Sequence, residues 1–236
     1  PDDAALAVDY NNLASIHELT GSYDRARELF EKALEHAPAW ESQSPLLLLQ
    51  LRQNLGRLLM LAGQAEASRH WLERPIPDDA QPAIATQRWR QRLHLADWHR
   101  RQGDAATARR FIAEAENHVE DIGGRGSNRY AALLRVRALL AWAEGDAGAA
   151  RADLLAAASI LPVSGEIALD LAELALAAGA ADAARQHLEQ GRGILAPVLD
   201  PVAPQRTRIA QLQRQLAETT PRSPPSPPSS GDSGAG

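Results

Sequence analysis

Five arginines in the middle of the chain could recognise carboxylates. A guanidinium group donates two parallel hydrogen bonds to a carboxylate, so a surface lined with arginine would bind an acidic segment or the C-terminus of a polypeptide. Arginines on helices also pair within their own molecule, and Glu18, Asp97 and Glu173 are available for that. The sequence leaves both roles open for Arg57, Arg90, Arg100, Arg101 and Arg135.

Two asparagines occupy matching places in the sequence. Asn12 stands just before Leu-Ala, and Asn54 stands just before Leu-Gly. An amide side chain donates and accepts hydrogen bonds, so a row of such residues could hold an extended peptide backbone whatever its sequence. The alternative is that each amide hydrogen-bonds only to a neighbouring helix or to water.

Other patterns of reactive residues are absent from the sequence. His94, Asp97 and His99 lack a third convergent ligand, and Gly123-Gly124-Arg125-Gly126 does not follow a strand, as a phosphate loop would. No nucleophile, base and orienting group form a recognisable set. The five tryptophans lie within helical patterns, which favours packing over base stacking. We therefore expect no enzyme activity, no cofactor and no metal site.

The elements that would position these residues are revealed by regularly placed glycines at 21, 63, 103, 145 and 179. A small residue follows five positions after each glycine, another precedes it by seven, and a large apolar residue follows by nine. Small residues at fixed places let two helices approach closely, while large ones fill the adjacent space. The spacing predicts five helix pairs joined at the glycines. Leu13, Ile16 and Leu19 form the expected buried stripe of the first helix.

The first unit resembles the tetratricopeptide repeat, whose signature is an aromatic residue, Leu-Gly/Ala, a turn glycine, alanine, an aromatic residue and a closing proline. Later units depart from it: Arg137 replaces a leucine, Gly191 replaces an alanine, and Pro75 should shorten the second helix of its unit. The resemblance extends from Tyr10 to about Pro197. In the first unit it rests on Tyr10, Leu13, Ala14, Gly21, Tyr23, Ala26, Phe30, Ala33 and Pro38.

The glycines are 42, 40, 42 and 34 residues apart, whereas the basic repeat has about 34 residues. The longer intervals resemble the kinesin-light-chain-like branch of the family. Its members grip a peptide main chain with an asparagine ladder, which Asn12 and Asn54 resemble. The carboxylate clamp of chaperone-binding members is similar in chemistry to the arginine set, but its Lys/Asn pattern does not match. The only lysine, Lys32, is on a second helix.

The resemblance implies an all-α fold, a right-handed α-solenoid in which the first helices line a concave groove that holds the ligand. Projecting the spacing onto that groove gives the candidate peptide-binding residues. They are Asn11, Asn12, Ser15, Gln53, Asn54, Arg57, Arg90, His94, Asp97, Arg100, Arg101 and Arg135.

After the fifth unit, Pro204 to Glu218 carries one more helical pattern, with Ile209, Leu212 and Leu216 on one face. Arrays of this kind need a terminal element with a polar outer face, so we expect a capping helix, with partner binding as the alternative. Residues 1–218 would form the repeat domain. Residues 219–236 are rich in Pro, Ser and Gly, which predicts a disordered tail.

Composition supports this assignment. The chain has 236 residues, 44% of them apolar and only 4% aromatic, which favours closely packed helices. A net charge of −5 argues against general nucleic-acid binding, and no apolar run is long enough for membrane insertion. The absence of Met at position 1 suggests a fragment or a processed product. The excess of arginine and alanine suggests a bacterial source. We expect a cytoplasmic protein, and the periplasm stays open.

These observations predict a scaffold for protein–protein interaction, with no covalent chemistry of its own. Two alternatives remain at this point. The array could be the regulatory or sensory arm of a larger bacterial enzyme or transcription regulator, such as a Ser/Thr kinase, or it could assemble with its own copies. The sequence leaves the partner and the oligomeric state open.

Overall fold

The computed structural model describes residues 3–76, 82–122 and 124–219, and within them all regular structure is helical. This confirms the predicted all-α class. The predicted disordered tail, apart from Thr219, lies outside the described residues. The five helix pairs are α1 (Asp3–Leu19) with α2 (Tyr23–Glu35), α4 (Pro45–Leu61) with α5 (Ala65–Leu72), α7 (Arg88–Arg101) with α8 (Ala105–Ile122), α9 (Asn128–Ala143) with α10 (Ala147–Ile160), and α11 (Gly165–Ala177) with α12 (Ala181–Leu195). Short helices α3 (Ala37–Trp40) and α6 (Pro82–Ala85) lie in connections, and α13 (Pro204–Glu218) ends the array.

Each pair turns at one of the five glycines. Their φ angles are 80°, 76°, 80°, 87° and 72° in chain order, a left-handed conformation that glycine adopts without steric cost. The residue after each glycine donates its backbone N–H to a carbonyl five residues earlier, for example Ser22 to His17 at 2.8 Å and Asp146 to Ala141 at 2.9 Å. This is the Schellman ending of a helix. The glycine spacing therefore marks the same turn in all five units.

Small residues lie where the two helices of each pair cross, and all of them are buried. A Cβ atom added to Gly56 would lie 2.6 Å from Leu72 Cδ2, which leaves no room for a side chain. Ser68 stands where other units have alanine, and its hydroxyl donates to the Gly56 carbonyl at 2.8 Å. Close packing, rather than apolar character alone, selects these residues.

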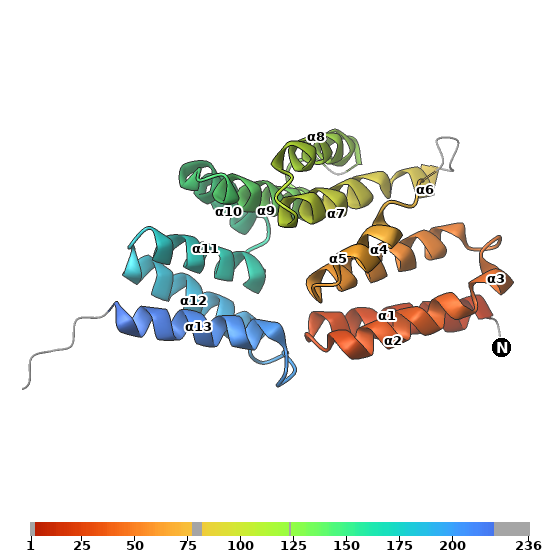
Figure 1. Cartoon of the computed structure of the whole chain (residues 1–236), viewed down its shortest axis with the longest axis horizontal. Helices are drawn as coiled ribbons and strands as arrows, with labels where there is room; N and C mark the ends of the chain where they lie inside the picture. Colours follow the sequence, from red (N-terminus) through yellow and green to blue (C-terminus); the bar gives the residue numbers. More distant parts are fainter. Residues whose placement is uncertain (1–2, 77–81, 123, 220–236) are drawn as a thin grey trace, which may run out of the picture.

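Successive pairs stack so that each second helix contacts the first helix of the next pair. Figure 1 shows this stack curving from α1 to α13. The last helix buries Ile209, Leu212 and Leu216 against α11 and α12, as expected for a cap. Its remaining surface is mostly polar, including Gln211, Gln213 and Arg214.

Two departures from the repeat pattern have local explanations. The second helix α5 ends at Leu72, before Pro75, and is the shortest second helix of the five pairs, as predicted. Arg137 replaces a leucine because Asp153 replaces an apolar residue on the facing helix. The guanidinium group donates to both oxygens of that carboxylate, at 2.7 and 2.8 Å, so an ion pair fills this layer.

The predicted stripe of α1 is wrong in one respect. Leu13, Ile16 and Leu19 are exposed, and α1 instead buries Ala7, Ala14 and Glu18. Helical periodicity identifies an apolar face, but that face is buried only where a neighbouring helix covers it.

The two ends of the array meet, so the expected open groove is closed on one side. The Asp200 N–H donates to the Thr20 carbonyl at 2.8 Å, and Ser22 Oγ donates to Asp200 Oδ2 at 2.8 Å. Gln205 donates to the Tyr23 hydroxyl at 3.1 Å. At Gly21 an added Cβ would come within 2.4 Å of Ala203 Cβ, so the first turn lies directly against the segment that leads into α13. In Figure 1 the helices accordingly follow a ring.

Candidate functional site

The first helices α7 and α9, in the middle of the array, present a regular stripe of side chains to the interior of the ring. Its members precede the turn glycine by 13, 9, 6 or 2 residues, which on a helix is a single face. In α7 these positions hold Arg90, His94, Asp97 and Arg101, and all four line the central cavity. These four residues of the predicted set therefore share one cavity, and their role in peptide binding stays a prediction.

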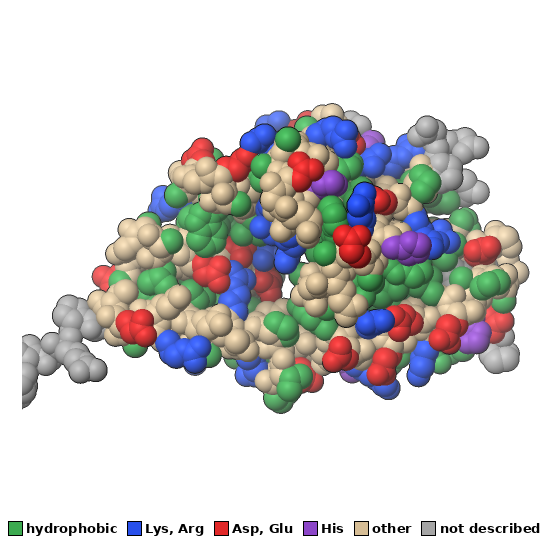
Figure 2. All heavy atoms as spheres, in the orientation of Figure 1, with side chains coloured by type: hydrophobic (Ala, Val, Ile, Leu, Met, Phe, Trp, Pro, Cys, Tyr) green, Lys and Arg blue, Asp and Glu red, His purple; other side chains and the backbone are tan. Residues whose placement is uncertain are grey.

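The central cavity has a volume of about 650 Å³. Figure 2 shows the molecule hollowed near the centre of the ring, with blue and red side chains around the opening. Its lining comes from both ends of the chain as well as from the middle, including Glu18 and Tyr23 near the start and Pro204 and Arg208 near the end. We call this cavity the chamber. Its size suits a few residues of a peptide, or a small ligand, rather than a whole helix.

Carboxylates gather on one side of the chamber. We call Glu166, Asp170 and Glu173 of α11 the acidic wall, of which Glu166 lines the chamber and Asp170 is buried. Arg135 Nε lies 2.5 Å from Asp170 Oδ2, and Arg208 of α13 lies 2.6 Å from both Asp170 Oδ1 and Glu173 Oε1. Burial alone would lower the pKa of both arginines, but the surrounding carboxylates outweigh it and hold each pKa above its usual value. Each carboxylate of the acidic wall therefore has an arginine partner within the protein.

The opposite side is basic. We call Arg57 of α4 with Arg90 and His94 of α7 the basic wall. Arg57 Nη2 lies 2.6 Å from Glu18 Oε1, so this arginine has a partner. Arg90 is half-buried, and no carboxylate or hydrogen-bond partner contacts its guanidinium group among the described residues. Burial first, and then the charge of Arg57, lower the pKa of Arg90, and the charge of Glu18 partly offsets them. Glu18 makes its ion pair with Arg57, so Arg90 has no contacting anion among the described residues.

His94 adds to the basic wall without carrying a charge of its own. It is buried, and no described residue hydrogen-bonds to its ring. Burial, followed by the charges of Arg57 and Arg90, lowers its pKa well below 6.5. The neutral imidazole lies beside apolar lining residues that include Met60, Leu93 and Val136. An arginine next to an apolar surface can hold a carboxylate attached to an apolar side chain.

The remaining arginines of the predicted set are paired inside the molecule. Arg100 and Arg101 donate to the two oxygens of Asp97, at 2.8 and 3.0 Å. Burial would raise the pKa of Asp97, but the two guanidinium groups prevail and lower it. Arg101 still lines the chamber, whereas Arg100 does not.

The predicted amide residues lie away from the chamber. Asn54 is buried and donates to Asn11 Oδ1 at 3.0 Å, so these two amides join adjacent first helices. Asn12 is exposed, Ser15 donates to the Asn11 carbonyl at 2.8 Å, and the buried Gln53 reaches the Gln87 carbonyl at 3.4 Å. These contacts leave an asparagine ladder without support in the structure.

Several chamber residues were missing from the predicted set. Arg208 and Gln205 come from the capping helix, and Tyr23 is the first residue of α2. They reach the chamber only because the ends of the array meet. The repeat spacing holds no signal for that contact. Glu166, which also lines the chamber, has the position of Arg90 in its own repeat, and the same projection places it on the inner face.

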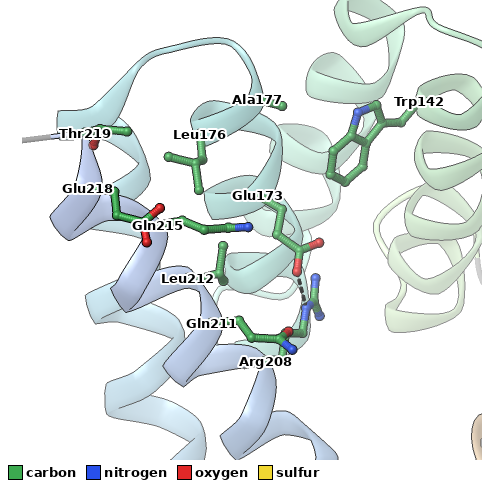
Figure 3. Close-up of a pocket in the computed structure, with 10 residues that line it drawn as sticks. All are labelled: Trp142, Glu173, Leu176, Ala177, Arg208, Gln211, Leu212, Gln215, Glu218 and Thr219. Carbon is green, nitrogen blue, oxygen red and sulfur yellow. Dashed lines mark hydrogen bonds and ion pairs between the residues drawn. The ribbon is translucent and has the colours of Figure 1, made fainter.

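A second, outer groove of about 580 Å³ lies between α9, α11 and α13. Figure 3 shows Trp142 on one side, Gln211 and Gln215 on the other, and the Glu173–Arg208 ion pair between them. Arg208 of this pair also lines the chamber, so it separates the two spaces. Among the described residues no group of three or more His, Asp or Glu side chains could hold a metal ion, and no helix there is long and apolar enough to cross a membrane.

Comparison with known proteins fits this geometry. Residues 10–39 match the family model of the tetratricopeptide repeat. The structure is similar to TTC0263, a thermophilic TPR protein of Thermus thermophilus, with a TM-score of 0.60 and 23% identity. The match covers 88% of this chain and 99% of that one.

The fold is that of a tetratricopeptide-repeat array. No curated protein matches the sequence. Neither the family model nor the structural match supports the kinesin-light-chain-like branch. The five pairs from α1 to α12 are thus the repeats of the array, and the chamber is its concave surface, closed by α13.

Proposed function

We propose that this protein is a protein-binding scaffold that holds the end of a partner polypeptide in the chamber, with its carboxylate on Arg90. The observation that carries the proposal is the half-buried guanidinium group of Arg90 on the inner face of the array, which no described residue pairs with. TPR arrays serve as binding scaffolds in general, which supports the choice of a protein partner.

Arg90 favours an anionic ligand for an energetic reason. A buried cation loses hydration, and a carboxylate at hydrogen-bond distance restores that loss with a charge-assisted bond. The acidic wall cannot supply this partner, because its carboxylates already bind Arg135 and Arg208. A ligand carboxylate would therefore compensate a charge that the fold leaves exposed to the chamber.

The chamber also selects the form of the ligand. Met60, Leu93 and Leu139 give it an apolar part of its lining, and its volume of about 650 Å³ limits the bound segment to a few residues. The C-terminal residue of a polypeptide presents a carboxylate and an apolar side chain together. An acidic loop would need more space for the segments that enter and leave.

Paired peptides test the proposal. Fluorescein-labelled hexapeptides of randomised sequence, ending in leucine, would be prepared with a free carboxylate and with an amide cap, and their binding followed by fluorescence anisotropy. We expect at least about tenfold tighter binding of the free carboxylate, the value of one charge-assisted contact of about 1.4 kcal/mol or more. Arg90→Met should remove that preference. Arg25→Met, at an exposed arginine of α2, is the matched control and should keep it.

Two results would argue against this function. The first is that the amidated peptides bind as tightly as the peptides with a free carboxylate. The second is that Arg90→Met retains the preference for a free carboxylate.

A further inference from the structure

The ring of helices is closed where its two ends meet, at a contact that we call the seam. Residues 20–23, at the turn between α1 and α2, meet residues 200–205, which lead into α13. Tyr23 and Gln205 belong to the seam, are joined by a hydrogen bond of 3.1 Å, and also line the chamber. The seam is therefore one part of the side wall of the chamber.

The seam differs in kind from the contacts between successive repeats. Among the described residues, the buried cores of α1 to α4 and of α11 to α13 are two separate clusters, and no buried apolar cluster spans the seam. Leu19, next to the seam in sequence, and Val202, within it, are 73% and 81% exposed. Hydrogen bonds join the ends instead, and two of these involve Asp200. Because each hydrogen bond replaces one with water, its net effect on stability is modest. Each end of the array therefore has its own core whether or not the ends meet.

Closure limits how a ligand can reach the chamber. With the seam closed, a polypeptide enters only through a face of the ring, and no internal segment can be laid in from the side. An internal segment that entered as a loop would need room for two strands, in a volume of about 650 Å³. A segment that was threaded would have to pull through everything on one side of it. A folded domain of about 100 residues has a radius of gyration of about 13 Å and is too large to pass.

We infer that the seam determines the specificity of the chamber for chain ends: by holding Tyr23 against Gln205 and Gly21 against Ala203, it excludes segments that lie between folded domains. The inference rests on the proposed function, because it concerns the ligand of the same chamber. It assigns the two parts of recognition to different residues. Arg90 selects the chemistry of the ligand, and the seam selects its position in the partner chain.

Two forms of one ligand test the inference. The first, the capped peptide, has six residues with one central glutamate, Gly/Ser spacers on both sides, and acetyl and amide caps. The second, the bridged form, is the same stretch joining two folded domains of about 100 residues each. Both carry one carboxylate for Arg90 and differ only in whether an end can enter. We expect the bridged form to bind the wild type at least about tenfold more weakly, measured by competition with a labelled capped peptide in fluorescence anisotropy.

Opening the seam should remove the difference between the two forms. Ser22→Asp with Ala203→Glu places two further carboxylates beside Asp200. The longer side chain at 203 also has no space, since a Cβ at Gly21 would already lie 2.4 Å from Ala203 Cβ. The helical circular dichroism should be unchanged, because each end keeps its own core, while small-angle scattering should give a larger radius of gyration. We expect the bridged form to bind this variant within about threefold of the capped peptide.

A matched control separates opening from added charge. Ser159→Asp with Val163→Glu adds the same two carboxylates at exposed positions near the turn between α10 and α11. This variant should keep the radius of gyration of the wild type and should still exclude the bridged form.

A locked ring tests whether ligands pass through the seam. The chain has no cysteine, so Ser22→Cys and Asp200→Cys can be joined by a short bifunctional thiol reagent. The capped peptide should bind the locked ring as tightly as it binds the wild type, because its end enters through a face of the ring.

Three results would overturn the inference. The first is that the bridged form binds the wild type as tightly as the capped peptide does. The second is that the opened ring, with its larger radius of gyration, still excludes the bridged form. The third is that the locked ring no longer binds the capped peptide, which would make the seam the entrance. None of these results depends on a preference for a free C-terminal carboxylate, so the proposed function is tested separately.

Discussion

The two walls of the chamber have opposite charges, and they differ in how many of their charged groups have a partner within the protein. The acidic wall receives two arginines, Arg135 from the neighbouring repeat and Arg208 from the capping helix. The basic wall receives one carboxylate, Glu18, which pairs with Arg57 and leaves Arg90 without a partner among the described residues. Compensated charges hold a structure together, and an uncompensated one is available to a ligand. The comparison separates the structural side of the chamber from the side that we propose binds.

Helix α13 has a second role beside that of a cap. Its apolar residues cap the last repeat, while Arg208 reaches into the chamber and contacts all three carboxylates of the acidic wall. Three like charges on one partly buried helix face would repel one another. Arg208 therefore ties the cap to the array with ion pairs as well as with apolar packing.

The largest effect is expected at the centre of the acidic wall. Asp170→Asn removes a carboxylate that is 1% exposed and contacts two guanidinium groups. Breaking one member of a buried ion-pair network leaves the others uncompensated, so we expect a loss of roughly 3–5 kcal/mol in the free energy of unfolding. Urea unfolding followed by circular dichroism measures it. Glu189→Gln, which breaks an exposed pair with Arg192, should change stability by less than about 0.5 kcal/mol. Equal losses for the two variants would contradict a structural acidic wall.

An intermediate effect is expected at the one ion pair of the basic wall. Arg57→Met keeps most of the side-chain volume but leaves the buried Glu18 carboxylate without its partner. Burial already raises the pKa of Glu18, and Arg57 only partly offsets this, so the variant should take up a proton there more readily. We expect a loss of about 1–3 kcal/mol at neutral pH, measured by thermal unfolding. If Glu18→Gln restores stability in the Arg57→Met background, the unpaired carboxylate is the cause; no restoration would exclude it.

The sequence predicted one part of this contrast and missed another. The difference lies in how far apart along the chain the interacting residues are. The turn glycines and the inner stripe repeat within each unit, so spacing was sufficient to place Arg57, Arg90, His94 and Asp97 near the concave side. The partners of the arginines were harder to predict. Asp97 pairs within one helix with Arg100 and Arg101 and could be foreseen, whereas Arg135 pairs with Asp170 in the next repeat.

Two features could not be predicted from local pattern. The contact of Asp200 with Thr20 and Ser22 joins residues that are far apart in sequence, and it depends on the summed curvature of five repeats. The exposure of Ile16 depends on a neighbour that only the assembled array identifies. Periodicity describes each helix, but neither closure of the ring nor coverage of a face is a property of one helix.

A smaller and pH-dependent effect is expected at His94. Its pKa in the folded protein lies well below the 6.5 of the unfolded state, because burial and then Arg57 and Arg90 disfavour the charged ring. The unfolded state therefore binds a proton first as the pH falls. The neutral His94 ring therefore makes its full contribution to the free energy of unfolding above pH 6.5. Below pH 6.5 that free energy declines by about 1.4 kcal/mol per pH unit, until the folded-state pKa is reached.

Thermal unfolding between about pH 7.5 and 5 measures this slope in the wild type and in His94→Gln, over a range that spans the ordinary pKa of histidine. The variant lacks the titrating group and should lose less stability over the range, whatever its stability at the upper end. Parallel curves would show that His94 is not held neutral by the basic wall.

The smallest effect on stability is expected at Arg90, and it is the one that distinguishes the walls most sharply. Arg90→Met removes a guanidinium group whose pKa is lowered by burial and by Arg57, and which no described residue pairs with. Its loss removes the smaller of two arginine charges that act on Glu18, and that carboxylate keeps its contact with Arg57. We expect the free energy of unfolding to change by less than about 0.5 kcal/mol, or to rise. Burial of a charged group costs hydration free energy. If Arg90 contributes nothing to stability, that cost is offset only when a group outside the protein pairs with the guanidinium group. A loss above about 1 kcal/mol in urea unfolding, the size of an ordinary destabilising substitution, would show that Arg90 stabilises the array, and the two walls would then have the same role.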